Sequence, residues 1–185
     1  MNTIVTSKEE ILEKSRELVL KSGWETLNIR SLAKACDVSI GSIYYYYNSK
    51  TDLVGATIES FWHDILHGSK NFKEFNNIQD FVIWIYERLK LGNKNYPGFF
   101  AYHSLLFLQK DKSDGKQLML KTWNHILNGL IYVLQNDKNI KSNTFDVNFS
   151  IDKYADFLFS YIISSIIKQD FDVSMILEII KRTLY

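Results

Sequence analysis

Apolar side chains recur every three or four residues along most of the chain, which is the spacing of amphipathic helices. The first such pattern runs from Ser7 to about Lys21, two short ones lie within 28–47, and a longer one extends from Ser49 to about His67. The polar segment Gly68–Asn77 is expected to separate two parts of the chain. Further helices are predicted at Ile78–Leu91, Pro97–Gln109, Asp114–Gln135, Ile151–Lys168 and Val173–Thr183, with a loop over Asn136–Asn148.

No segment alternates polar and apolar residues in the manner of a strand, so the fold class is predicted to be all-α with about nine helices. Pro97 suits the first turn of a helix, and Gly92 suits a helix end.

Residue types at the ends of the two short helices predict a tight turn between them. Asn28 and Ser39 are of the residue types that cap helices, and Ser49 with Asp52 makes a further capping pattern. Asp37 tolerates the left-handed backbone conformation that such a turn needs. Two short helices joined in this way, with a third behind them, are the layout of a helix-turn-helix DNA-binding unit.

Side-chain spacing divides the second short helix into two faces. Ile43 and Tyr47 are four residues apart and are expected to point inward. The opposite face is then predicted to be exposed and to provide DNA contacts; it comprises Ile40, Gly41, Ser42, Tyr45 and Tyr46.

Twelve residues stand in the order and spacing of a known family: Gly23, Leu27, Arg30, Leu32, Ala33, Val38, Ser39, Gly41, Tyr44, Tyr45, Lys50 and Leu53. Over about Ser7–Asp64 the chain therefore resembles the TetR family of transcriptional repressors. It departs from the usual family pattern at Cys36 and Asp37, where Ala and Gly are common, and at Tyr46 and Tyr47, where His and Phe are common. The resemblance implies a DNA-binding domain over 5–65, with its motif at 28–47, and a helical effector-binding and dimerisation domain over 66–185.

The resemblance also implies roles for individual residues. Bases in the major groove would be contacted by Arg30, Ile40, Gly41, Ser42 and Tyr45, and phosphates by Tyr44, Tyr46 and Lys50. The chemistry fits, because Arg matches the paired acceptors of guanine and Ile can touch a thymine methyl. The whole predicted DNA-binding set is Arg30, Ser39, Ile40, Gly41, Ser42, Tyr44, Tyr45, Tyr46 and Lys50.

Charge sets a limit on how this surface can hold DNA. Residues 1–66 carry seven basic and nine acidic side chains, whereas DNA-binding domains are more often basic. Hydroxyl and backbone donors are therefore expected to supply much of the grip on phosphates.

The last two predicted helices offer more apolar surface than one chain can cover. A symmetric homodimer through the helices near 151–168 and 173–183 is expected, and it would place two reading helices on successive major grooves of a palindromic double-stranded operator. The positions on these faces are Tyr154, Phe157, Leu158, Tyr161, Ile162, Ser165 and Ile166 on one helix and Ile176, Leu177, Ile179, Ile180 and Leu184 on the other.

Aromatic side chains are dense in the middle of the chain, and as a group they suggest an apolar pocket for a small-molecule effector. The residues chosen as its lining are Phe61, Trp62, Trp84, Tyr102, His103, Phe107 and Trp123. An alternative is that this half of the chain binds a protein partner, such as a cell-division or nucleoid factor.

Signals for an enzyme are weak. His63 and His67 have a spacing that can hold a metal, but Asp64 stands where the metalloprotease pattern requires Glu. We therefore predict no catalytic residues, no metal site and no cofactor. The longest apolar run, Phe157–Ile167, is too short to span a membrane, so we expect no membrane partner and a cytoplasmic protein. Cys36 is the only cysteine and cannot form an internal disulfide.

Overall fold

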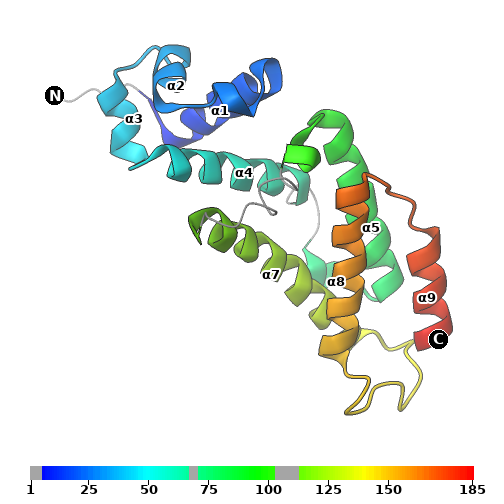
Figure 1. Ribbon diagram of the computed structural model, residues 1–185. Helices are drawn as coiled ribbons and strands as arrows, with labels where there is room; N and C mark the ends of the chain where they lie inside the picture. The colour runs from blue at the N-terminus through cyan, green and yellow to red at the C-terminus, as the bar shows by residue number, and fades with distance from the viewer. Residues whose placement is uncertain (1–5, 67–70, 103–112) are drawn as a thin grey trace. The chain divides into compact units, whose positions relative to one another are not determined.

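The computed structural model describes residues 6–66, 71–102 and 113–185, and in these residues all regular structure is helical, as predicted. Figure 1 shows the helices with their labels. Their bounds are α1 Lys8–Ser22, α2 Ile29–Ala35, α3 Ile40–Tyr46, α4 Lys50–Leu66, α5 Ile78–Asn95, α7 Ser113–Asn136, α8 Ile151–Lys168 and α9 Ser174–Leu184, with short 3-10 helices at Trp24–Thr26 and Phe72–Glu74.

The chain divides into two compact units. One contains residues 1–64 and 105–119, and the other contains residues 65–104 and 120–185.

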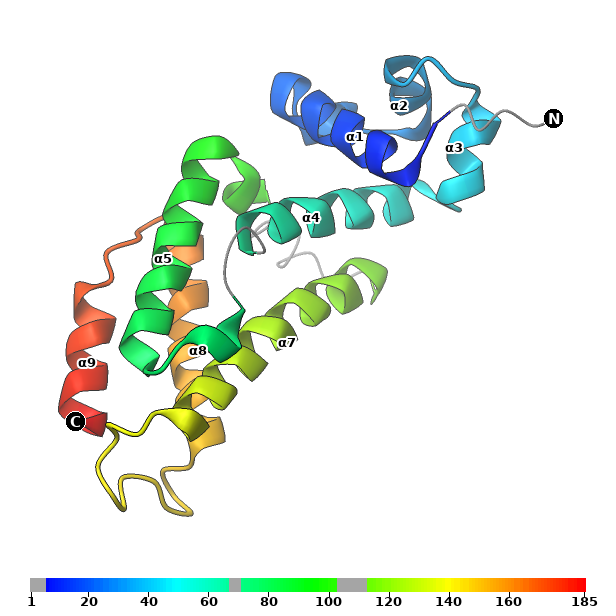
Figure 2. The ribbon, with the colours of Figure 1, turned by 180° about the vertical axis from the view of Figure 1, so that it is seen from behind.

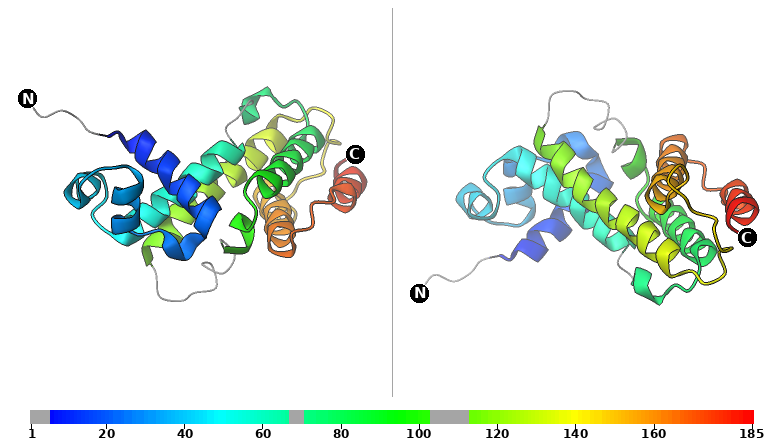
Figure 3. Two further views of the ribbon diagram at one scale, coloured as in Figure 1. Left: turned by 90° about the horizontal axis from the view of Figure 1, so that it is seen from above. Right: turned by 90° about the horizontal axis from the view of Figure 1, so that it is seen from below.

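In the first unit, α1, α2 and α3 gather into one group (Figure 3). The predicted caps are present: the side chain of Asn28 accepts from the backbone N–H groups of Arg30 and Ser31, both at 3.0 Å. Ser39 Oγ accepts from the N–H of Ser42 at 3.1 Å in the same way. These bonds satisfy donors that a helix of seven residues would otherwise leave open to water.

The turn between α2 and α3 has the predicted conformation. Asp37 has φ +54°, in the left-handed region. This reversal brings the N–H of Val38 to the carbonyl oxygen of Ala33 at 3.0 Å. Asp37 is therefore a workable replacement for the more usual glycine.

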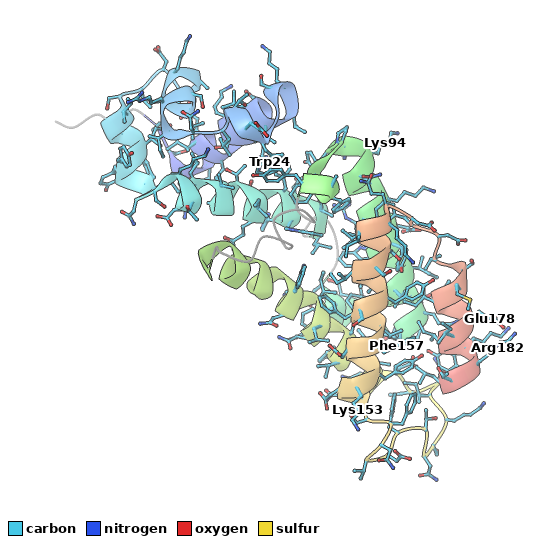
Figure 4. The ribbon with its side chains drawn as sticks, in the orientation of Figure 1. Trp24, Lys94, Lys153, Phe157, Glu178 and Arg182 are labelled. Atoms are coloured by element: carbon cyan, nitrogen blue, oxygen red, sulfur yellow. The ribbon has the colours of Figure 1, made fainter. Side chains whose placement is uncertain are left out.

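Apolar side chains from all four helices fill the centre of this unit. Fully buried residues include Ile11, Leu32, Ile43 and Leu53. Trp24, labelled in Figure 4, is also buried, and its ring lies 5.7 Å from that of Phe61. Packing thus holds the short helices in place.

In the second unit, α5, α8 and α9 lie side by side (Figures 1 and 2). A buried hydrogen bond joins the hydroxyls of Tyr86 in α5 and Ser165 in α8 at 2.9 Å. Beyond α7, the buried carboxylate of Asp137 accepts from the N–H of Ile78 at 3.0 Å and from the hydroxyl of Tyr185. One acidic side chain therefore fastens the start of α5 to the last residue of the chain.

Two sequence-based boundaries are wrong. Helix α5 does not end at Gly92 but continues to Asn95, with Gly92 buried in its interior. The next helical residues begin at 99 rather than at Pro97, because Gly98 has φ +79° and interrupts the helix. Most of the helix predicted over 97–109 lies outside the described residues.

Gly92 is explained by a close approach of two segments rather than by a helix end. A Cβ at this position would lie 2.8 Å from Cγ1 and 3.2 Å from Cγ2 of Ile65. At the same place, the Arg88 side chain donates from Nε to the carbonyl oxygen of Ile65 at 2.5 Å. The glycine allows the end of α4 to press directly against α5.

We predict that Gly92→Ala destabilises the protein by about 1–2 kcal/mol. The clash with both branches of Ile65 costs about 1–3 kcal/mol, and it outweighs the gain of up to about 1 kcal/mol in helix propensity. Gly41→Ala is the matched control, because its Cβ would meet only Ser39 Oγ at 3.6 Å, and it should be neutral or stabilising. Urea unfolding of the three proteins measures the difference. Equal shifts for the two variants would contradict the packing argument.

Candidate nucleic-acid interface

Helix α3 has one buried and one exposed face, as the sequence predicted, but Ser42 and Tyr46, which were expected to be exposed, are half-buried. Ile43 is fully buried and Tyr47 is 3 % exposed, whereas Tyr45 is 84 % exposed. Ile40 and Tyr44 are exposed beside it. Three large side chains in contact with water on a seven-residue helix are unusual for a surface that serves only the fold.

The N-terminal end of the exposed face of α3 carries small residues. Gly41 is exposed, and a Cβ there would meet only Ser39 Oγ at an ordinary 3.6 Å, so the fold itself does not require glycine. Ser42, which is half-buried, exchanges a hydroxyl hydrogen bond of 2.9 Å with Ser39. A base or phosphate can therefore approach this end of α3 closely.

Basic groups lie on the helices either side of α3. Arg30 is exposed in the first turn of α2, and Lys50 is exposed at the first position of α4. The N–H of Asp52 is capped by Ser49 Oγ at 3.0 Å. The remaining N–H groups of the first turn and the helix dipole favour an anion near Lys50.

Helix α1 carries four acidic side chains, which four basic ones balance. Glu9, Glu13 and Glu17 are exposed there, and Glu17 pairs with Lys14 at 2.8 Å. The acidic excess of residues 1–66 therefore lies outside α1, and α3 itself has no charged side chain.

The hydroxyl of Tyr46 is engaged within the protein. It donates to the backbone carbonyl oxygen of Thr6 at 2.8 Å. A phenol has one proton to donate, so in this conformation Tyr46 has none to offer a phosphate. Sequence reasoning missed this bond, since nothing in the local pattern links residues forty positions apart.

Tyr47 is buried without a hydrogen-bond partner for its hydroxyl among the described residues. Burial, reinforced by the charge of Glu9, raises the pKa of Tyr47 to about 12. The side chain is part of the core, where burial of the ring is favourable and burial of the unpaired hydroxyl costs free energy.

The residues predicted to line an effector pocket fall in both units. Phe61 and Trp62 are buried in the first. Trp84, Tyr102 and Trp123 are half-buried in the second. His103 and Phe107 lie outside the described residues.

The second unit contains a cluster of aromatic rings on α5 and its neighbours. The rings of Phe81 and Trp84 are stacked at 5.9 Å, and Phe75 lies 5.6 Å from Trp84. The indole N–H of Trp84 is buried, and no described residue accepts from it. Trp123 packs edge-on against Phe159 at 5.8 Å.

The metal hypothesis gains no support from the described residues. They contain no group of three or more His, Cys, Asp or Glu side chains that could hold a metal ion. His63 and Asp64 are exposed on α4, and His67 lies beyond the described part of this helix. Within the same residues, no helix is long and apolar enough to cross a membrane.

Comparison with known proteins identifies the first unit. Residues 11–57 match the family described as bacterial regulatory proteins, tetR family, and this range includes all of α2 and α3. Over these residues the chain matches that family, as the sequence resemblance predicted. The match supports a DNA-binding transcriptional regulator. No curated protein sequence matches the chain.

Solved structures share the fold along most of the chain. A putative TetR regulator from Streptomyces avermitilis is 12% identical, with a TM-score of 0.68 and full coverage of both chains. FadR from Bacillus subtilis, in complex with stearoyl-CoA, is 16% identical, with a TM-score of 0.65 over 88% of this chain and 86% of that one. A TetR variant from Acinetobacter baumannii, in complex with minocycline, is 14% identical, with a TM-score of 0.55 over 89% and 82%.

We predict that Tyr47→Phe stabilises the protein by about 1 kcal/mol, because it removes a buried hydroxyl that costs about 1–3 kcal/mol when unpaired. The effect should grow at high pH. An unfolded tyrosine ionises near pH 10, whereas the folded Tyr47 keeps its proton to about pH 12. The free energy of unfolding of the wild type therefore decreases as the pH rises from about 10 to about 12, because the unfolded state loses the Tyr47 proton first. The phenylalanine variant lacks this decrease. Chemical unfolding at pH 7 and at pH 10 to 11 measures both effects. A destabilised Tyr47→Phe would show that the hydroxyl has a partner.

Proposed function

We propose that the protein is a repressor that binds a palindromic operator as a homodimer and is released by a small apolar or aromatic effector. The observation that carries the DNA-binding part is the division of α3, in which Tyr45 projects into water while Ile43 and Tyr47 are buried beneath it. Such a face is held rigidly from below, which base readout requires.

Each exposed side chain suits a particular contact. Arg30 can donate two hydrogen bonds to guanine, Ile40 can touch a thymine methyl, and Ser42 can bond to several bases. We assign Tyr44 and Lys50 to phosphates, and the N-terminus of α4 would assist Lys50. Tyr45, the most exposed of the group, is assigned to the base edges.

The dimer proposal is supported by apolar side chains that remain exposed on α8 and α9. Phe157 on α8, labelled in Figure 4, is 43% exposed, and Ile167 on α8 and Met175 on α9 are more exposed still. The inner faces of both helices are already buried, with Leu158, Ile162, Ile176 and Ile180 fully enclosed. A second copy of the chain would cover the remaining apolar surface.

The effector proposal is supported by the aromatic residues of the second unit and by the ligands of two similar folds. Stearoyl-CoA and minocycline are both large and partly apolar, and they are bound by the FadR and TetR proteins named above. Around Trp84 and Trp123, this chain has the side chains that such molecules require. An effector would need to bind better to the conformation that does not fit the operator, since equal affinity would shift nothing.

A second candidate function, binding of a protein partner by the C-terminal half, is favoured by one feature. The loop between α7 and α8 presents Val147, which is 90% exposed, next to Phe149. This loop is ordered, because Asp146 accepts from the N–H groups of Asn148 and Phe149 at 2.7 Å. A fixed loop with an apolar tip is suited to protein contact.

Selection of bound sequences from random duplex DNA tests the central proposal, and a palindromic consensus is the expected result. With the selected operator, Tyr45→Ala should weaken binding at least about tenfold, because each lost base contact costs about 1–3 kcal/mol and a dimer loses two. Val147→Ala removes exposed apolar atoms from the other unit and is the control. If no palindrome emerges and Tyr45→Ala binds as tightly as wild type, the proposal is wrong.

We further predict that Phe157→Arg converts the dimer to a monomer, because two guanidinium groups would be buried at the symmetric contact. Leu91→Arg is the matched control, since Leu91 is exposed to a similar extent on α5. Sedimentation velocity over a range of concentrations measures both. A dimeric Phe157→Arg, or a monomeric wild type, would contradict the proposed interface.

A further inference from the structure

The hydrogen bond between Tyr46 and Thr6 joins two distant parts of the first unit. Tyr46 is the last residue of α3, and Thr6 lies two residues before the start of α1. The donor and acceptor are 2.8 Å apart. The C-terminal end of α3, the helix proposed to contact the bases and called the reading helix below, is thereby fixed to the segment that precedes α1.

Thr6 is buried and hydrogen-bonded within the first unit. Only 5% of the residue is exposed, and its hydroxyl donates to Glu10 Oε2 at 3.1 Å. The adjacent Ser7 caps α1 by accepting from the N–H of Glu10, also at 3.1 Å. The carbonyl that receives the Tyr46 proton is therefore held in place by its neighbours.

On its other side, Tyr46 supports the side chain assigned to the bases. The rings of Tyr45 and Tyr46 meet edge to face, with centroids 5.0 Å apart and planes at 88°. This arrangement is favourable for aromatic pairs. Because Tyr45 is 84% exposed, it has little else to restrict its orientation.

We infer that Tyr46 is a positioning residue: it links Thr6 to the reading helix and orients Tyr45 for operator binding. This inference rests on the proposed DNA-binding function. It replaces the phosphate contact that the sequence suggested for Tyr46, because the hydroxyl proton is already used. It also makes residue 6 part of the reading unit, although residue 6 lies far from α3 in the sequence.

Tyr46→Phe tests the inference, because it removes the hydroxyl and keeps the ring. Five variants are compared with wild type: Tyr46→Phe, a chain that starts at a methionine before Ser7, the combination of these two, Tyr44→Phe as the matched control, and Tyr44→Phe combined with the truncation. Hydrogen exchange over residues 6–11 is measured in the free protein, and operator affinity is measured with the selected duplex.

The expected result is faster exchange at the start of α1 in Tyr46→Phe but not in Tyr44→Phe, together with operator binding about two- to tenfold weaker, the range expected for one hydrogen bond. The truncation should weaken binding similarly, and the combined variant should be no worse, because both changes remove the same bond. The losses of binding free energy caused by Tyr44→Phe and by the truncation should instead add in the combined variant.

Two results would overturn the inference. The first is unchanged hydrogen exchange in Tyr46→Phe together with weaker operator binding, where the losses from Tyr46→Phe and from the truncation add in the combined variant. This result would mean that Tyr46 touches DNA directly. Unchanged binding would mean that the bond has no role in operator recognition. If wild type binds no duplex at all, the proposed function fails, whereas faster exchange in Tyr46→Phe would still establish the link to Thr6.

Discussion

Helices α2 and α3 are each seven residues long, which is too short for a helix to persist in water on its own propensity. Their existence depends on the side chains buried between them and α1 and α4. Ile43 and Tyr47 bury the inner face of α3, and Leu32 does the same for α2. Caps at Asn28 and Ser39 satisfy the first N–H groups. Any change that loosens this packing would therefore remove the reading surface together with the helix.

The exposed face of α3 has little charge. Its prominent groups are phenols, a hydroxyl and an aliphatic side chain, and none of the acidic residues of the unit lies on α3. Recognition would then depend on shape and directed hydrogen bonds more than on long-range attraction. For that reason the exact placement of side chains such as Tyr45 becomes more important than it would be on a strongly basic surface, and supporting contacts below and beside them gain in value.

Local patterns were sufficient to predict much of the first unit. The caps, the left-handed turn at Asp37 and the buried positions of Ile43 and Tyr47 all follow from spacing and residue type within a few positions. Contacts between distant segments could not be predicted in this way. Gly92 resembles a helix end until Ile65 is placed against it, and Tyr46 resembles a free phenol until Thr6 is found beside it. In both cases the deciding neighbour is more than twenty residues away.

The surroundings of Gly41 have a consequence for how such a protein can change over time. Because a Cβ at this position would meet only Ser39 Oγ, at an ordinary contact distance of 3.6 Å, alanine there costs the fold little, and under the proposed DNA contacts it would alter the surface that meets the bases. Tyr45 is 84% exposed and Ile40 43% exposed, so substitutions at these positions also disturb the core less than changes at Ile43 or Tyr47. Under the proposed contacts, new operator preferences would be accessible through single substitutions that leave the domain intact, and divergence of related regulators toward different genes would be expected to begin at these three positions.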